Sequence, residues 1–289
     1  MFRGSIVALA TPFKGDFSID MDALGRLVDF HLEHGTDGIV PCGCTGEAAT
    51  LAHEEQEQVI RFVIERVAGR VPVIAGTGSN NTAEALRLTQ FAKEAGADGA
   101  LLITPYYNKP TPEGQIAHFT KIAEAVDIPI VLYNVPGRTG TNILPETTAA
   151  LSRVPNIVAT KEAAGSVDQV SAILGQCDIT VLSGDDTLTL PMMAVGGRGV
   201  ISAGANAVPA HMAQLCAAFD EGNLKRAKEI HYEILPILKG LFLETNPIPV
   251  KAVLARMGLI ENVLRLPLTP MRADKWAELE PIAQKLGLF

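Results

Sequence analysis

The chain has 289 residues, of which 47% are hydrophobic and 19% are charged, so it carries enough apolar surface for one large core and too little charge for a disordered protein. Its 24 basic and 32 acidic residues give a net charge of -8 without long runs of one sign, which argues against a nucleic-acid or anionic-membrane surface. No apolar stretch is long enough to span a membrane, and no signal peptide precedes the first expected strand, so we expect a cytoplasmic protein.

Eight short apolar runs, rich in β-branched residues, alternate with helical patterns along the first three quarters of the chain. Such runs are typical of strands that are buried on both faces. In chain order the expected strands are residues 5–10, 38–41, 71–75, 99–103, 128–133, 157–161, 179–183 and 199–202.

Capping residues mark the ends of the expected helices. Asn81 and Thr111 stand where the side chain of a helix N-cap would accept a backbone hydrogen bond. Glycines follow several helical patterns, where a left-handed residue would end the helix. They are Gly35, Gly69, Gly96 and Gly222.

Eight buried strands that each return through a helix must be parallel, and we therefore predict a (β/α)₈ TIM barrel over residues 1–222. A doubly wound open sheet is the alternative, but residues 10–13 (Ala-Thr-Pro-Phe) stand where its glycine fingerprint would follow the first strand. Residues 223–289 show no strand signal. They predict a C-terminal helical appendage packed on the barrel, with breaks at Pro236, at residues 246–249 and at Pro267.

The catalytic face of a TIM barrel is built at the carboxyl ends of its strands, and Lys161 and Tyr133 end two neighbouring strands there. A buried lysine tends to lose its proton, and the neutral amine is a nucleophile toward carbonyl carbon. A phenol beside it can carry the protons that imine formation moves. The alternative is that Lys161 lies at the rim and pairs with Glu162.

Two features predict anion sites near this amine. Residues 43–46 (Gly-Cys-Thr-Gly) form a turn whose backbone N–H groups can face a carboxylate, and Arg138 offers a planar guanidinium for a second one. Taken singly, the turn could be only a tight strand-to-helix connection, and Arg138 only a surface arginine. Together with Lys161 they indicate a binding site for a 2-keto acid.

At these residues the chain resembles the dihydrodipicolinate synthase family of the pyruvate-dependent class I aldolases, and the resemblance runs the whole length. It implies a lyase that condenses pyruvate with L-aspartate-4-semialdehyde to give 4-hydroxy-tetrahydrodipicolinate, in the diaminopimelate route to lysine. The segments that carry it are residues 43–47, 104–110, 133–139, 161–163, 183–186 and 246–251.

The resemblance implies a role for each of several residues. Lys161 would form the imine with pyruvate and Tyr133 would move protons, so no separate cofactor or metal is expected. Thr45, with the backbone at 44 and 45, would hold the pyruvate carboxylate, and Arg138 would bind the carboxylate of the semialdehyde. Gly184 and Ile201 match positions that line the pyruvate pocket.

The family's assembly is also implied. A tyrosine matching Tyr107 enters the active site of a neighbouring subunit, so we expect a homotetramer built as a dimer of dimers. Position 44 departs from the family, because Cys44 stands where a threonine hydroxyl usually links Tyr133 to Tyr107. A thiol is a weaker and longer hydrogen-bonding group, so we expect a working but altered proton relay.

Inhibition by L-lysine is a further implication of the resemblance. His53, Asn80, Glu84 and Tyr106 match the residues of the lysine site in feedback-sensitive members, whereas Gln56 replaces a histidine found in some of them. Glu84 also fits a capping box at the start of its helix, and both roles are compatible.

Other readings of the sequence remain open. The same scaffold could serve an N-acetylneuraminate lyase or a 2-keto-3-deoxy sugar acid aldolase, although a polyol asks for hydroxyl partners rather than Arg138. A non-catalytic barrel that senses a small molecule is a third reading, which the pairing of Lys161 with Tyr133 disfavours. His31 and His34 lack accompanying carboxylates for a metal site, and the adjacent acids 185 and 186 are expected to cap a helix.

Overall fold

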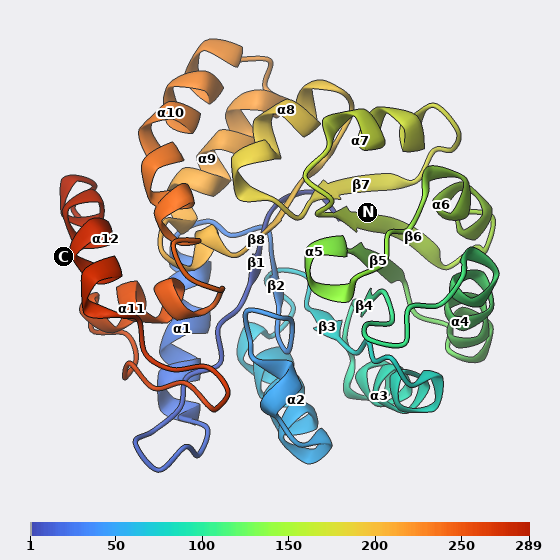
Figure 1. Cartoon of the computed structure of the whole chain (residues 1–289), viewed down its shortest axis with the longest axis horizontal. Coiled ribbons are helices and arrows are strands. Elements are labelled where there is room, and N and C mark those ends of the chain that lie inside the picture. Colours follow the sequence, from blue (N-terminus) through green and yellow to red (C-terminus); the bar gives the residue numbers. More distant parts are fainter. Residues whose placement is uncertain (1) are drawn as a thin grey trace.

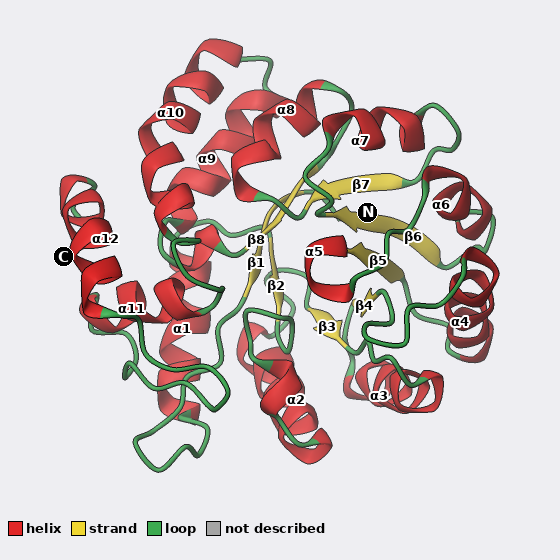
Figure 2. Ribbon diagram, in the orientation of Figure 1, coloured by secondary structure: helices red, strands yellow, loops and turns green. Residues whose placement is uncertain are grey.

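Eight parallel strands form a central barrel in the computed structural model, which describes residues 2–289 (Figures 1 and 2). The sheet order is β2-β1-β8-β7-β6-β5-β4-β3, and a parallel bridge between Ile39 and Val73 joins β2 to β3. The predicted (β/α)₈ barrel is confirmed. Its strands are β1 (Gly4–Ala8), β2 (Gly38–Val40), β3 (Ile74–Gly76), β4 (Gly99–Ile103), β5 (Ile130–Asn134), β6 (Ile157–Glu162), β7 (Thr180–Ser183) and β8 (Gly199–Ser202).

The expected strand limits agree for β4 and β8 and shift by one to three residues elsewhere. The third strand begins at Ile74 rather than at residue 71, since Pro72 has no N–H to give to a ladder. The first strand ends at Ala8, because the N–H of Ala10 donates to the side chain of Asn206 instead of to a neighbouring strand.

Helices cover the outside of the barrel (Figure 2). Asn81 and Thr111 cap α3 and α4 as expected, and the four predicted C-terminal glycines all have positive φ. The helices of the barrel are α1 (Met21–Glu33), α2 (His53–Val67), α3 (Thr82–Ala95), α4 (Pro112–Ala125), α5 (Pro136–Thr139), α6 (Pro145–Leu151), α7 (Val167–Leu174), α8 (Thr189–Ala194) and α9 (Pro209–Asp220), with 3₁₀ turns η1 (Ala48–Thr50), η2 (Asp186–Leu188) and η3 (Gly204–Asn206).

Three helices follow the barrel: α10 (Leu224–Gly240), α11 (Ile248–Arg256) and α12 (Ala273–Lys285), drawn in orange to red in Figure 1. The breaks expected at residues 246–249 and at Pro267 are present. The break expected at Pro236 is wrong, because α10 runs through this proline. Pro236 has no N–H to donate to the carbonyl oxygen of Tyr232, but Tyr232 is exposed. The buried residues Ile234 and Ile237, on either side of the proline, hold the helix against the barrel.

The tail packs against the barrel through a shared apolar cluster. Leu215 of α9, Ile230 and Ile234 of α10, and Leu279 of α12 all belong to this cluster and are buried. The barrel of residues 1–222 and the helical region of residues 223–289 follow one another along the chain. Whether they are two separate domains stays a prediction.

A buried ion pair ties α11 to the turn after β2. The Nζ atom of Lys251 lies 2.6 Å from Oε1 of Glu47 and 3.0 Å from the carbonyl oxygen of Thr11, and both charged side chains are almost fully buried. Burial lowers the pKa of Lys251, and the Glu47 carboxylate opposes this effect. The charge of Lys251 is therefore stabilised by contact with Glu47 and not by water.

We predict that Lys251→Met lowers the free energy of unfolding by about 3–5 kcal/mol, because Glu47 would remain buried without its partner. The double variant Glu47→Gln/Lys251→Met should recover most of this loss. Denaturant unfolding followed by Trp276 fluorescence measures the effect, since the single tryptophan lies in α12. The control is Arg256→Met, which removes an exposed ion pair with Glu280 and should lower the free energy of unfolding by less than about 1 kcal/mol. Equal losses of stability in Lys251→Met and Arg256→Met would contradict this prediction.

Candidate active site

Lys161 and Tyr133 lie side by side inside the barrel. They are register partners on β6 and β5, only 5% and 6% of their surfaces are exposed, and Nζ of Lys161 lies 4.2 Å from the centre of the Tyr133 ring. Tyr133 belongs to the apolar cluster in the barrel interior, together with Leu182 and Ile201. The amine is therefore shielded from water and lies over the face of a phenol.

This environment changes the protonation of Lys161. Burial lowers its pKa to about 8, and the neighbouring Cys44 and Asp186 oppose that effect only in part. The alternative pairing with Glu162 does not occur, because the Glu162 carboxylate accepts hydrogen bonds from Asn134, Gln169 and the N–H of Ala164. Alternation along β6 places the two side chains on opposite faces of the strand.

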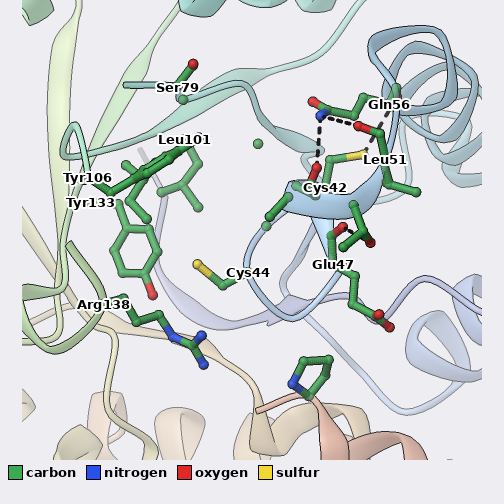
Figure 3. A pocket seen from close by; sticks show the side chains of 18 of the residues that line it. Cys42, Cys44, Glu47, Leu51, Gln56, Ser79, Leu101, Tyr106, Tyr133 and Arg138 are labelled. Carbon is green, nitrogen blue, oxygen red and sulfur yellow. Dashed lines mark hydrogen bonds between the residues drawn. The ribbon is translucent and has the colours of Figure 1, made fainter. Parts of the chain in front are cut away.

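Tyr133 is the second ionisable group of the site. Burial raises its pKa well above the ordinary value, the adjacent Cys44 raises it further, and Arg138 acts in the opposite direction. Figure 3 shows the sulfur of Cys44 and the guanidinium of Arg138 on the side of the phenol oxygen. A neutral phenol in this position can both donate and accept a proton.

The turn after β2 has the free donors expected of a carboxylate site. The hydroxyl of Thr11 donates to the carbonyl oxygen of Gly46 at 2.7 Å and holds the turn against the end of β1. Thr45 is buried, and no hydrogen bond within residues 2–289 engages the N–H groups of Cys44 and Thr45. These donors remain available to a ligand.

Arg138 lies on α5, in the loop that follows β5. The side chain of Asn134 closes this loop by donating to Oδ1 of Asn142 at 2.6 Å and accepting from the N–H of Ile143 at 2.9 Å. The Nη2 atom of Arg138 donates to the carbonyl oxygen of Asn246 at 2.9 Å. The guanidinium is thus held on the side of the Tyr133 phenol oxygen (Figure 3), and within residues 2–289 its other N–H groups make no hydrogen bond.

Gly184 lies against the Lys161 side chain, and Ile201 lies in the apolar cluster of the barrel interior. A Cβ atom at Gly184 would lie 3.1 Å from Cε of Lys161 and 2.7 Å from Cβ of Ala163, so a larger residue would press on the lysine side chain. Ile201 is fully buried on β8 within the interior cluster. Neither residue lines the cavity described below, and their place in a pyruvate pocket stays a prediction.

Asp186 is a charged neighbour of Lys161 that the sequence did not reveal. Asp185 caps η2 as expected, but the carboxylate of Asp186 is buried and accepts from the N–H of Gly204 at 2.7 Å. Burial raises its pKa to about 6, and Lys161 acts against that rise. β7 pairs directly with β6, so the end of β7 lies beside Lys161, but no sequence signal showed which of the two adjacent acids would be the buried one.

A cavity of about 470 Å³ opens beside these groups (Figure 3). Its walls include Tyr133, Cys44 and Arg138, and it extends to residues of the expected lysine site. Those residues are His53, Glu84 and Tyr106; Asn80 lies outside the wall and donates to the carbonyl of Tyr106 instead.

Tyr107 does not join the catalytic group of its own chain. Its side chain is 88% exposed and its φ is +70°, so it projects away from the barrel. Within residues 2–289 there is no cluster of three or more metal-ligating side chains and no helix long and apolar enough to cross a membrane. His31 is a buried core residue whose pKa falls to about 3 because of burial.

Comparison with known proteins decides the family. The sequence model described as "Dihydrodipicolinate synthetase family" matches residues 1–286. The chain belongs to this family. It is 54% identical over 291 residues to a 4-hydroxy-tetrahydrodipicolinate synthase of Syntrophus aciditrophicus (strain SB), and the match covers 100% of both chains.

Two solved structures show how far the similarity extends in space. A chloride-inhibited dihydrodipicolinate synthase from Acinetobacter baumannii, complexed with pyruvate, superposes with a TM-score of 0.98 at 45% identity and covers 100% of each chain. The enzyme from Cyanidioschyzon merolae with lysine bound gives a TM-score of 0.97 at 41% identity, with 100% of this chain and 99% of that chain covered.

The Asp186 carboxylate predicts a measurable shift in the behaviour of Lys161. At pH 7 to 8 Asp186 is ionised and favours the charged amine, so Asp186→Asn should let Lys161 lose its proton at lower pH. The midpoint of the pH dependence of borohydride-trapped pyruvate adduct should fall by on the order of one pH unit. Asp185→Asn removes the same charge from a residue that caps η2 and should leave the midpoint in place; an unchanged midpoint in Asp186→Asn would show that this carboxylate does not act on the amine.

Proposed function

We propose that this protein condenses pyruvate with L-aspartate-4-semialdehyde through an imine on Lys161 and releases 4-hydroxy-tetrahydrodipicolinate, as a step toward lysine. The observation that carries the proposal is the buried amine, with a pKa of about 8, held against a neutral phenol at the catalytic end of a TIM barrel. Membership of the dihydrodipicolinate synthase family supports the same reaction.

The chemistry follows from these two groups. The Lys161 amine attacks the keto carbon of pyruvate, and loss of water gives a protonated imine. Loss of a proton from the pyruvate methyl group gives an enamine, whose carbon attacks the aldehyde. The substrate amine then adds to the imine carbon and displaces Lys161, which closes the ring and frees the enzyme. Tyr133 accepts and returns the protons that these steps move.

Two anion sites orient the substrates. Thr45 and the free N–H groups at 44 and 45 hold the pyruvate carboxylate, with Gly184 and Ile201 shaping the space around its methyl group. Arg138 binds the carboxylate of the semialdehyde with the donors that Asn246 does not use. The pyruvate bound to the Acinetobacter baumannii relative supports this assignment.

The remaining partners come from other subunits. Tyr107 enters a neighbouring active site and extends the relay from Tyr133 through Cys44, and its 88% exposure in one chain fits this role. The functional assembly is a homotetramer made of two tight dimers. No cofactor beyond the covalent imine takes part, and the enzyme acts in the cytoplasm.

L-Lysine is the proposed inhibitor. His53, Glu84 and Tyr106 line one end of the cavity, and the lysine bound to the Cyanidioschyzon merolae relative supports a site of this kind. Gln56 donates through its amide to the carbonyl oxygens of Ala48 and Leu51, so it does not offer the same group as a histidine. We therefore expect weaker inhibition than in relatives with a histidine there.

The test of this function is trapping combined with substrate choice. Borohydride reduction in the presence of pyruvate should add one reduced pyruvate to Lys161 of the natural protein, as located by peptide mass spectrometry. Lys161→Ala should lose the adduct and lower turnover with the semialdehyde by more than about a thousandfold. If the protein turned over N-acetylneuraminate or 2-keto-3-deoxy sugar acids but not the semialdehyde, its function would be that of a sugar acid aldolase. Absence of the adduct would favour a sensor.

Cys44 gives a second prediction within this mechanism. Cys44→Thr restores a shorter and stronger hydrogen-bonding group between the two tyrosines, so kcat should rise by a few fold and its pH profile should shift. The pyruvate KM should change little, because the backbone at 44 remains. Cys177 is a half-buried cysteine just after α7, outside the cavity wall, so Cys177→Thr is the control and should leave the profile unchanged. Unaltered turnover and pH profile in Cys44→Thr would show that position 44 has no part in the relay.

A further inference from the structure

Asn246 lies outside the barrel, between α10 and α11, yet it borders the catalytic cavity and is 5% exposed. Its Nδ2 atom donates to the hydroxyl oxygen of Thr45 at 3.0 Å, and its carbonyl oxygen accepts from Nη2 of Arg138 at 2.9 Å. One residue of the C-terminal tail therefore contacts both side chains that are proposed to hold substrate carboxylates, although these come from loops after two non-neighbouring strands.

The direction of the bond to Thr45 has a chemical consequence. A hydroxyl has one proton to donate, and a group that donates to its oxygen leaves that proton free. Asn246 is the donor here, and within residues 2–289 the Thr45 hydroxyl donates to no other atom. Its proton can therefore point to a carboxylate, together with the free N–H groups of Cys44 and Thr45.

The other end of the same amide is left without a partner. Oδ1 of Asn246 is buried and accepts no hydrogen bond within residues 2–289. An unpaired buried oxygen destabilises the fold, so a side chain with a purely structural role here would be expected to satisfy both of its ends. The contact with Arg138, in contrast, uses the backbone and does not depend on which side chain stands at 246.

We infer that Asn246 is a positioning residue for pyruvate, whose amide group turns the proton of the Thr45 hydroxyl toward the keto acid carboxylate. The inference rests on the proposed function, because it assigns a partner to the carboxylate site of that reaction. The two anion sites would depend on different parts of Asn246. Its side chain orients the hydroxyl of Thr45 at the pyruvate carboxylate, and its backbone carbonyl holds Arg138.

The decisive variant is Asn246→Asp, which keeps the size of the side chain and replaces the donor by an acceptor. The Thr45 hydroxyl would then donate to the new carboxylate and turn its proton away from pyruvate, and the new charge would repel the keto acid. The pyruvate concentration that half-saturates borohydride trapping on Lys161 should rise at least about tenfold, and Asn246→Ala should raise it about threefold to tenfold. The KM of the semialdehyde should change less than twofold, because the backbone contact to Arg138 remains.

Two controls separate positioning from loss of structure. Asn262→Asp adds the same charge at an exposed site of the tail and should leave trapping unchanged. In a Thr45→Val background, Asn246→Ala should add less than a twofold effect, because its action passes through the hydroxyl. Circular dichroism and thermal unfolding check that each variant folds. If Asn246→Asp does not fold, the double-mutant cycle of Thr45→Val and Asn246→Ala tests whether Asn246 acts through the Thr45 hydroxyl.

The outcomes are distinct. Suppose that the natural protein traps pyruvate. The role of Asn246 is then overturned, and the proposed reaction stands, if pyruvate trapping in Asn246→Asp saturates at the same concentration as in the natural protein. Additive effects of Thr45→Val and Asn246→Ala lead to the same conclusion. Equal rises in the half-saturating concentrations of both substrates would also overturn it, because a structural role predicts that pattern. A natural protein that traps no pyruvate overturns both proposals.

Discussion

The desolvation of one amine is the constraint on which the site depends. A charged ammonium is disfavoured where water is excluded, and Lys161, enclosed by the barrel interior and the ring of Tyr133, consequently has a pKa of about 8. About a tenth of the molecules hold a neutral nucleophile at pH 7, far more than for an exposed lysine. The nearby Asp186 acts in the opposite direction and limits how far the pKa of Lys161 falls.

The C-terminal helices contribute to this site as well as to the fold. Lys251 pairs with Glu47 in the turn after β2, and Asn246 contacts both Thr45 of that turn and Arg138. Both contacts come from the start of α11 and the loop before it. The positions of Thr45 and Arg138 thus depend on packing between the tail and the barrel.

The sequence was sufficient for the features that depend on local pattern. Periodicity and strand order predicted the barrel, and strand ends predicted that Lys161 and Tyr133 would meet. Pro236 was read as a break because a proline removes one helix bond, whereas tertiary packing keeps α10 continuous. Asp186 could not be told from Asp185, since its burial is fixed by a hydrogen bond from the N–H of Gly204, 18 residues along the chain. The exposed side chain of Tyr107 contributes nothing to the site of its own chain, so its role stays a prediction.

The central claim, a Lys161 amine whose pKa is lowered to about 8 by burial, is tested most directly by competitive labelling of the unliganded protein with a small neutral acylating reagent. Peptide mass spectrometry across a pH series follows Lys161 beside exposed lysines such as Lys14 and Lys121. The account predicts a midpoint near pH 8 for Lys161, well below the value of about 10.4 that is typical of lysine in peptides. A common midpoint for all three would contradict it.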